Sequence, residues 1–350
     1  MNKDVTIYDI AKKIGVSSTT VSRALNNHPA VNELTKKRIL ETAEEMGYRF
    51  NVFASNLRSK KTHNIGVIVP RLNSSFQSSV LAGMEKVANE LGYNLIISQS
   101  LESFEKEKAN VNSMFNSRVD GLLVSLAENT STYSHFNPFL EKEIPVLFFD
   151  RVPLNTNFAG VVIDNIQASY NATSHLISQG CRRIAHVLGS EQVNVYMDRL
   201  KGYKYALVEH QISFNPELVL HTDFTEDRSA AIVDWMCAMD QLPDGLFVSN
   251  DTMAASCISE LKARNIRIPE DIAIMGFNND VISRLIEPHL STTNYPGYAM
   301  GELAMRNLIN HLTGENEAIL HNTETITLRA ELIIRNSSLK SKKIKAHSLE

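Results

Sequence analysis

The sequence predicts a small all-α head followed by a larger α/β body made of two similar halves. Three observations predict this fold class. Residues 1–49 form short amphipathic segments, whereas from residue 64 continuous apolar strands alternate with helices. The pattern Asp-Gly-Leu-x-Val-Ser occurs at 120–125 and again at 244–249. Such alternation is typical of a parallel sheet covered on both faces, and two series of it predict two halves that face each other across a cleft.

Chain length, apolar runs and cysteine spacing together indicate which broad class of protein this is. A chain of 350 residues is long enough for more than one domain. It contains no apolar run near the roughly 20 residues that span a bilayer, and its start lacks the apolar core of a signal peptide. Its three cysteines form no CxxC pair. We therefore expect a cytoplasmic protein with no membrane partner, no disulfide, no metal site and no cofactor.

The charge is divided unevenly along the chain. Residues 1–63 carry 11 Lys and Arg against 6 Asp and Glu, a net charge of +5, and the remainder carries 24 against 33, a net charge of -9. A basic head on an acidic body favours nucleic acid binding at the head, although chance local composition is the alternative.

Two helices are predicted at the start of the head. The segment TIYDIAKKIG (6–15) places Ile7, Ile10, Ala11 and Ile14 on one face and ends at Gly15. In VSSTTVSRALNN (16–27), Ser17 is the expected N-cap, and the residues expected to face inward are Val21 and Leu25.

A third helix is predicted within NELTKKRILETAEEMGY (32–48). It starts after the cap Asn32 and ends at Gly47. The side chains expected to be buried are Leu34, Ile39, Ala43 and Met46.

The first two helices and the turn IGVSS between them fit a helix-turn-helix. The small Ala11 allows close packing, and Gly15 suits a turn with positive φ. The second helix presents polar side chains outward. Hydroxyls bind phosphates and base edges, and a guanidinium can pair with guanine through two bonds. The alternative is a capped surface helix, but the agreement of the turn, hydroxyls and basic surroundings favours DNA. The outward residues are Ser18, Thr19, Thr20, Ser22 and Arg23.

The body continues as strands and helices in a repeated order. After the strand NIGVIVP comes the helix FQSSVLAGMEKVANELG, which stops at Gly92. A polar, basic tail follows Arg335 and is expected to be disordered. The further predicted strands are YNLIIS (93–98), DGLLVSL (120–126), IPVLFFD (144–150), RIAHVLG (183–189) and PDGLFVSND (243–251).

The head pattern T-x-x-D-I-A-x-x-x-G-V-S-x-x-T-V-S-R-x-L-N, from Thr6 to Asn26, resembles the headpiece of the LacI-type family of bacterial transcription regulators. This family includes the lactose and purine repressors, and the resemblance covers essentially the whole chain. It implies an all-α helix-turn-helix headpiece plus an α/β core, similar to periplasmic sugar-binding proteins, of two doubly wound parallel-sheet subdomains.

The resemblance also implies domain limits. Residues 1–49 are the headpiece, 50–63 a hinge helix and linker, 64–338 the effector-binding core, and 339–350 a disordered tail. Within the core, the N-subdomain takes about 64–162 and 295–323, and the C-subdomain takes about 163–294 and 324–338.

The resemblance assigns roles in DNA binding. It places Ser18, Thr19 and Arg23 at base-reading positions in the major groove. Residues at phosphate-contacting positions set register and affinity but not sequence, and their contacts weaken with salt. The matching residues are Thr6, Ser17, Thr20 and Asn26.

A hinge helix is implied within NVFASNLRSK (51–60). Asn51 precedes it, Ala54 matches a packing position, and Leu57 matches the leucine that wedges into the minor groove at the operator centre. The family often has Pro where this chain has Phe50. A helix of about eight residues is shorter than the roughly 12–15 that are marginal in water, so we expect it to order only with a second copy and DNA.

The resemblance also implies an effector site in the cleft. Asp150 ends a strand, and Arg199 matches a ligand-gripping arginine. Phe76 and Phe224 match aromatics that face or stack on ligands, and Asn250 matches a strand-end contact, with Asp251 capping the next helix.

Each of these residues has an alternative role. The two phenylalanines could be core residues, Asp150 could pair with Arg151 or cap a turn, and Arg199 could belong to a structural ion pair.

Two departures from the family affect the effector class. Asn278 stands where members often have Asp, and an amide donates as well as accepts. Val193 and Val195 replace the purine-specific partners, so a purine corepressor is not expected and a sugar or sugar derivative is favoured by analogy.

The sequence therefore predicts a homodimeric repressor on a pseudo-palindromic operator, controlled by a small molecule. The tail has no leucine heptads for tetramerisation. An exported solute-binding protein, an enzyme and an effector-blind DNA binder remain alternatives. No GxSxG, HExxH, P-loop or GxGxxG motif occurs in its required context, so no catalytic residue is assigned. The direction of coupling stays open.

Overall fold

The computed structural model describes residues 5–48, 61–154, 156, 158–225, 227–314 and 325–340. The chain divides into two compact units between Thr62 and His63, and each is described by itself. Within the part of the chain that the structure describes, no helix has the length and apolar character that a membrane crossing requires.

The first unit contains the three predicted helices, α1 (Ile7–Ile14), α2 (Ser18–Leu25) and α3 (Glu33–Glu45). Gly15 ends α1 with φ +76°, a conformation that favours glycine. Each helix contributes small or β-branched side chains to one common core. Its buried members are Ile10, Ala11, Val21, Ala24, Val31, Ile39 and Ala43.

The prediction that Leu34 is buried is wrong, because its side chain is 80% exposed. Asn32 caps α3 as expected and accepts a hydrogen bond from the Leu34 amide at 2.9 Å. Leu34 lies five residues before the buried Ile39, which places it about 140° away around a helix that turns about 100° per residue.

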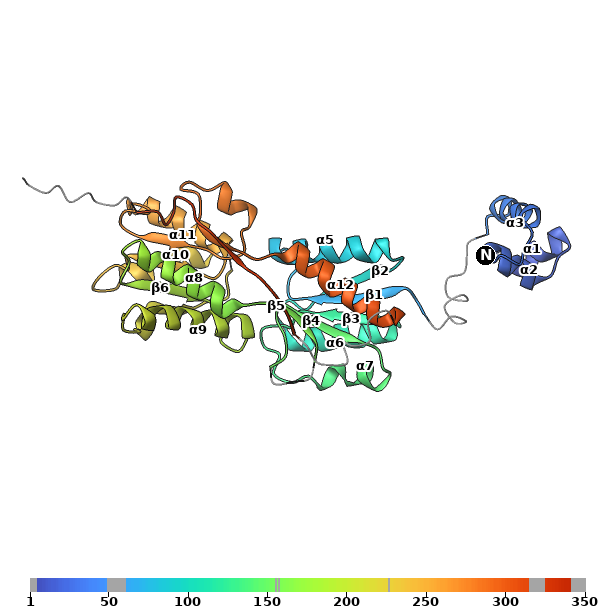
Figure 1. Cartoon of the computed structure of the whole chain (residues 1–350), viewed down its shortest axis with the longest axis horizontal. Helices are drawn as coiled ribbons and strands as arrows, with labels where there is room; N and C mark the ends of the chain where they lie inside the picture. The colour runs from blue at the N-terminus through green and yellow to red at the C-terminus, as the bar shows by residue number, and fades with distance from the viewer. Residues whose placement is uncertain are drawn as a thin grey trace, which may run out of the picture. The chain divides into compact units, whose positions relative to one another are not determined.

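The second unit contains two parallel sheets (Figure 1). The first has the strand order β11-β5-β4-β3-β1-β2, and every pairing in it is parallel. The apolar strands alternate between two faces, as the strand period requires. Its strands are β1 (Asn64–Val69), β2 (Asn94–Gln99), β3 (Gly121–Val124), β4 (Val146–Phe149), β5 (Gly160–Ile163) and β11 (Thr325–Leu328).

The second sheet has the order β7-β6-β8-β9, also parallel throughout. A separate antiparallel pair, β10 (Thr292–Asn294) and β12 (Glu331–Ile333), completes the described strands. The members of the second sheet are β6 (Ile184–Leu188), β7 (Val219–His221), β8 (Gly245–Val248) and β9 (Ala273–Met275).

Helices cover both faces of each sheet. In the first half, α5 and α12 pack on Val67 and Leu123, and α6, η1 and α7 pack on the opposite face at Leu122 and Phe148. In the second half, α8 and α9 lie on one face and α10 and α11 on the other. The helices are α5 (Ser75–Glu90), α6 (Phe104–Asn116), η1 (Ser134–Phe136), α7 (Asn137–Glu141), α8 (Asn165–Ser178), α9 (Asn194–Glu209), η2 (Pro216–Leu218), α10 (Arg228–Cys237), α11 (Asp251–Ala263), η3 (Val281–Arg284) and α12 (Gly297–Thr313).

The sequence repeat marks equivalent positions in the two halves. The carboxylate of Asp120 accepts a hydrogen bond from the His63 amide at 2.8 Å, just before β1. The carboxylate of Asp244 accepts from the amides of Arg182 and Arg183, both at 2.8 Å, just before β6. Each aspartate therefore fixes the start of the neighbouring parallel strand, which explains why the pattern occurs once in each half.

The structure corrects two predicted limits. Residues from 324 onward were assigned to the second half, but β11 pairs with β5 in the first sheet. The tail after Arg335 was expected to be disordered, yet Ser337 and Ser338 are fully buried, and Lys340, within the expected tail from 339, donates to the Asp244 carbonyl at 2.9 Å. The alternating pattern of β11 indicates a strand but not the sheet that it joins, and the tail segment 336–340 is mostly polar, so its burial had little apolar signal in the sequence.

Two helices of the first half cross with their backbones in close contact. On α5, a Cβ added to Gly83 would overlap the carbonyl oxygen of Tyr298 on α12. On α12, a Cβ added to Gly301 would overlap the carbonyl oxygen of Val80. Backbone atoms cannot rotate away as a side chain can, so this crossing requires glycine. The second half repeats the device, because Gly202 on α9 approaches the Ile166 carbonyl on α8 in the same way.

We expect Gly83→Ala to destabilise the chain by about 1–3 kcal/mol, because the added methyl group forces α5 and α12 apart. Urea unfolding followed by circular dichroism measures the change. Glu85→Ala, at an exposed position on the same helix, is the matched control and should stay within about 0.5 kcal/mol of the wild type. Equal midpoints for the two variants would contradict the close crossing.

Candidate functional site

The second helix of the first unit carries the predicted polar face. Ser17 caps α2 by accepting from the Thr20 amide at 3.1 Å, and the two hydroxyls lie 2.9 Å apart. Ser18 and Ser22 are half-buried, whereas Thr19 and Arg23 are exposed. Val21 and Ala24 are buried on the other side. The core contacts thus leave one side of the helix polar and accessible.

Two predicted phosphate-contacting residues already have local partners. The Thr6 hydroxyl donates to the Asp9 carboxylate at 2.7 Å, and the Asn26 amide donates to the Ser22 carbonyl at 2.7 Å. Both residues are exposed. A hydroxyl and an amide keep further bonding capacity after one bond, so each can still meet a phosphate.

The two predicted hinge residues, Asn51 and Leu57, lie outside the described residues. Their roles in the minor groove stay predictions.

The effector residues predicted from the sequence line one cavity of about 500 Å³ in the second unit. Its walls come from both halves. Strand ends contribute to it, with Asp150 following β4 and Ser249 following β8, as expected for the carboxyl ends of parallel strands. The predicted residues that line it are Phe76, Asp150, Arg199, Phe224, Asn250 and Asn278.

Asp150 is the centre of a buried polar network. Its carboxylate accepts from the Tyr295 hydroxyl at 2.5 Å, the Gln77 amide at 3.3 Å and the Ser125 hydroxyl at 3.3 Å. Burial raises the pKa of Asp150, and the nearby Arg151 charge opposes that rise. The alternative pairing with Arg151 is not what the hydrogen bonds show, because that guanidinium donates to Glu102 at 2.7 Å.

Arg199 is buried and lies against aromatic rings. It donates to the Asn165 side chain at 2.9 Å and to the Ser249 carbonyl at 3.1 Å, and its guanidinium carbon lies 3.6 Å from the Phe277 ring centroid. Burial lowers its pKa. A guanidinium has five N–H donors, and these two bonds to described residues leave further donors for a ligand.

The two predicted aromatics serve in both the core and the cavity wall. Phe76 is 8% exposed and stacks on Tyr295, with ring centroids 4.2 Å apart. Phe224 lies 5.8 Å from the Tyr196 ring. The first pair is stacked and the second is tilted, and aromatic contacts of both kinds restrict the orientation of the rings.

The roles of two adjacent residues differ from the prediction. Asn250, not Asp251, caps α11, because its side chain accepts from the Met253 amide at 2.8 Å. Asp251 is fully buried and accepts from the Thr292 hydroxyl at 2.7 Å and the Asp280 amide at 2.8 Å. Burial raises its pKa to about 7. Asp251 therefore anchors the loop that carries Asn278 and Asp280 into the cavity.

Several cavity residues have positive φ although they are not glycine. The values are 59° for Glu102, 59° for Asp150, 54° for Phe224 and 120° for Asn278, and all four line the cavity. Such conformations cost of order 1–3 kcal/mol each and cluster at functional sites. This strain favours the cavity as the site of ligand binding.

The sequence reasoning missed several wall residues. Tyr196 lies one turn before Arg199 on α9, and this spacing could have revealed it. Gln77 adjoins the predicted Phe76. Tyr295 had no such signal, because its contact with Asp150 joins residues 145 positions apart.

Comparisons with known proteins match both units of the chain. Residues 6–51 match the lacI family of bacterial regulatory proteins, and residues 173–338 match a periplasmic binding protein-like domain. Catabolite control protein A of Priestia megaterium is 34% identical over 314 residues, which are 89% of this chain and 94% of that protein.

Two solved structures are similar along almost the whole chain. The transcriptional regulator CelR in complex with cellobiose has a TM-score of 0.71 at 26% identity, covering 95% of this chain and 99% of that one. The lac repressor dimer bound to operator and the anti-inducer ONPF has a TM-score of 0.86 at 23% identity, covering 97% and 100%. The second likeness concerns the fold alone.

We expect Asp251→Asn to remove a pH dependence of stability. The pKa rises from about 3.9 in the unfolded chain to about 7 in the folded one. The proton is therefore held more tightly in the folded state, and its stabilisation is complete below about pH 4 and lost as the pH rises through 7.

Urea unfolding at pH 5, 6, 7 and 8 tests this. The difference in unfolding free energy, wild type minus variant, should fall with pH by up to about 1.4 kcal/mol per unit. Asp227→Asn, at an exposed position, is the control. A difference for Asp251→Asn that stays constant across this range would contradict the assignment.

Proposed function

The chain belongs to the lacI family of bacterial regulatory proteins, and from this we propose that it is a transcriptional repressor whose operator affinity is controlled by a small molecule in the cleft. One observation carries the proposal. The same chain holds an exposed polar face on a helix-turn-helix and a strained, polar cavity between two α/β halves. In this proposal the protein acts in the cytoplasm, binds operator DNA and catalyses no reaction.

The second helix enters the major groove in this proposal. Ser18, Thr19, Ser22 and Arg23 face the bases, and Ser17, Thr20, Thr6 and Asn26 contact phosphates. The guanidinium of Arg23 is exposed, and a bidentate contact with guanine is the commonest specific one. Asn51 and Leu57 act at the operator centre, where Leu57 opens the minor groove and bends the DNA.

The cavity suits a sugar or a sugar derivative. Arg199 supplies donors, Asp150 supplies a carboxylate, and Phe224 supplies an aromatic face. Asn278 adds an amide that both donates and accepts. This mixture matches the alternating hydroxyls and C–H faces of a sugar ring, and CelR has been solved with cellobiose. Binding changes the relation of the two halves, and the hinge segment transmits the change because β1 begins two residues after Thr62.

A homodimer on a pseudo-palindromic operator completes the proposal. The similar lac repressor structure is a dimer on its operator. In this chain β2 is an edge strand, and Ile97 is 42% exposed on it, with Leu101 beyond its end 43% exposed. Apolar side chains at an open sheet edge favour coverage by a partner. Light scattering should give the mass of two chains, and a mass of one or four chains would contradict this assembly.

We expect Arg23→Ala to weaken binding to the selected operator by about 1–3 kcal/mol. A pseudo-palindromic operator is first enriched from random duplexes with the wild-type protein, and gel shifts at fixed salt then measure affinity. Lys108→Ala, an exposed cation on α6, is the control and should bind as the wild type does. Operator affinity that is unchanged in Arg23→Ala would contradict a base-reading role for this residue.

We expect Arg199→Lys to abolish stabilisation by the effector. Lysine keeps the charge but lacks the planar set of donors. A thermal-shift screen of neutral sugars against the full chain first finds ligands that raise the melting temperature, as binding to the folded state must. Arg264→Lys, outside the cavity, should keep the shift. A chain that responds to purine bases and to no sugar would contradict the effector class.

A further inference from the structure

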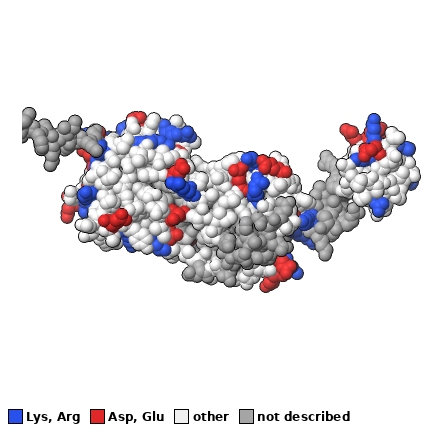
Figure 2. All heavy atoms as spheres, in the orientation of Figure 1, with Lys and Arg blue, Asp and Glu red and all other residues white. Residues whose placement is uncertain are grey.

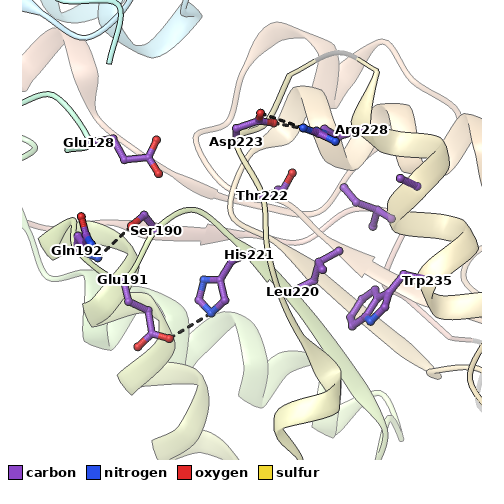
Figure 3. Close-up of a pocket in the computed structure, with 12 residues that line it drawn as sticks. Glu128, Ser190, Glu191, Gln192, Leu220, His221, Thr222, Asp223, Arg228 and Trp235 are labelled. Carbon is purple, nitrogen blue, oxygen red and sulfur yellow. Dashed lines mark hydrogen bonds and ion pairs between the residues drawn. The ribbon is translucent and has the colours of Figure 1, made fainter. Parts of the chain in front are cut away.

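A second cavity of about 780 Å³ adjoins the cleft (Figure 3). Glu128, Thr222 and Asp223 line both cavities, so the two adjoin at these residues. Glu128 follows β3 of the first half, whereas Thr222 and Asp223 follow β7 of the second. Each cavity alone falls within the roughly 300–1,000 Å³ typical of small-molecule sites. We propose that the adjoining cavity is a second subsite, and that the effector is a neutral oligosaccharide of at least two units.

This inference rests on the proposed function and extends it. One sugar unit occupies the cleft beside Arg199, and the next lies in the adjoining cavity beside Trp235.

The adjoining cavity has an apolar wall at its far end. Figure 3 shows Glu128 and Trp235 on opposite sides of it. Trp235 is half-buried and packs on the core of the second half with Leu220 and Ile232. Its ring is fixed by that packing and partly open to the cavity, so it offers a flat apolar surface for the C–H face of a sugar.

Polar groups surround this wall. The backbone N–H of Gln192 donates to the Ser190 hydroxyl at 3.3 Å. This bond does not use the side-chain amide of Gln192, which can therefore bond a ligand. Thr222 adds a hydroxyl between Trp235 and Glu128 (Figure 3). An amide and hydroxyls around an aromatic ring suit a ligand rich in hydroxyl groups.

The charges disfavour an anionic ligand. Asp223 pairs with Arg228 at 3.2 Å and Glu191 pairs with His221 at 3.1 Å. The Glu128 carboxylate has no ion pair among the described residues, since the adjacent Arg151 and Arg71 are engaged by Glu102. Burial and the Glu102 charge raise the pKa of Glu128. A carboxylate at the junction accepts hydrogen bonds from hydroxyls and repels a phosphate.

Figure 2 shows Lys and Arg interspersed with Asp and Glu over much of the visible face of the second unit, with several Lys and Arg gathered along its upper edge at the left.

The chain itself supplies a probe, because Trp235 is its one tryptophan. We expect maltose, cellobiose or lactose to shift and quench the tryptophan emission of the full-length protein, because the second sugar unit of each disaccharide contacts the indole of Trp235. Glucose and galactose should occupy the cleft alone and leave the emission unchanged.

Isothermal titration calorimetry with single-residue variants tests whether the second sugar unit lies in the adjoining cavity. Gln192→Ala should weaken the active disaccharide by roughly tenfold, the value of one good hydrogen bond in a site, and leave monosaccharide affinity unchanged. Trp235→Leu should also weaken the disaccharide and leave monosaccharide affinity unchanged. Because Trp235 packs on the core and its substitution can affect folding, the Gln192→Ala variant at an exposed position is the independent test. Glu141→Gln, at an exposed position on α7 that lines neither cavity, is the control.

The outcomes separate the subsite from the proposed function. Binding of monosaccharides with no gain for any disaccharide, or equal losses for both classes in Gln192→Ala, overturns the subsite and leaves the repressor assignment intact. Tighter binding of glucose 6-phosphate than of glucose overturns the exclusion of anions. No response to any neutral sugar, with operator binding retained, overturns the sugar effector and the subsite together.

Discussion

Asp150 links the two halves of the second unit, because its buried carboxylate bonds the first half and Tyr295 while its backbone carbonyl bonds the second half. The side chain of Asp150 receives hydrogen bonds from α5, from the end of β3 and from Tyr295, and its carbonyl accepts from Asn194 of α9 at 3.2 Å. These partners come from both halves. Because an unpaired buried carboxylate is costly, the positions of α5, the end of β3 and Tyr295 depend on one another, and a ligand that bonds the Asp150 carboxylate changes the bonding of all three.

The parts of the fold that were predictable are those encoded locally. Buried strands such as NIGVIV and helices with one apolar face are visible in any short window of sequence, and the caps Ser17 and Asn32 are fixed by the residues just after them. The repeated Asp-Gly pattern was informative for a related reason. Each aspartate bonds the backbone just before the adjacent parallel strand. The pattern therefore recurs because each half contains the same pair of neighbouring strands.

The parts that were not predictable depend on distant contacts. β11 has an alternating, half-exposed pattern and is recognised as a strand of the first sheet only by its pairing with β5. Asn250 and Asp251 are adjacent and both are capping types, and the choice between them is made by Thr292 and Asp280, far along the chain. The cavity residues followed from resemblance to a family, whereas Tyr295 needed the structure, since its partners lie in other segments.

The pairing of β11 with β5 has a consequence for synthesis on the ribosome. The first half begins at β1 but lacks an edge strand and the helix α12 until residues beyond 297 have emerged. The second half has its sheet strands β6 to β9 in sequence before then, but Ser337 bonds Ile274 of β9 and Lys340 bonds the Asp244 carbonyl, so it also needs the last described residues. Domains generally fold as their residues become available. Both halves therefore wait for the last segments of the chain, and until β11 has emerged the edge of the first sheet at β5 is unpaired and open to misassembly or chaperone binding during translation.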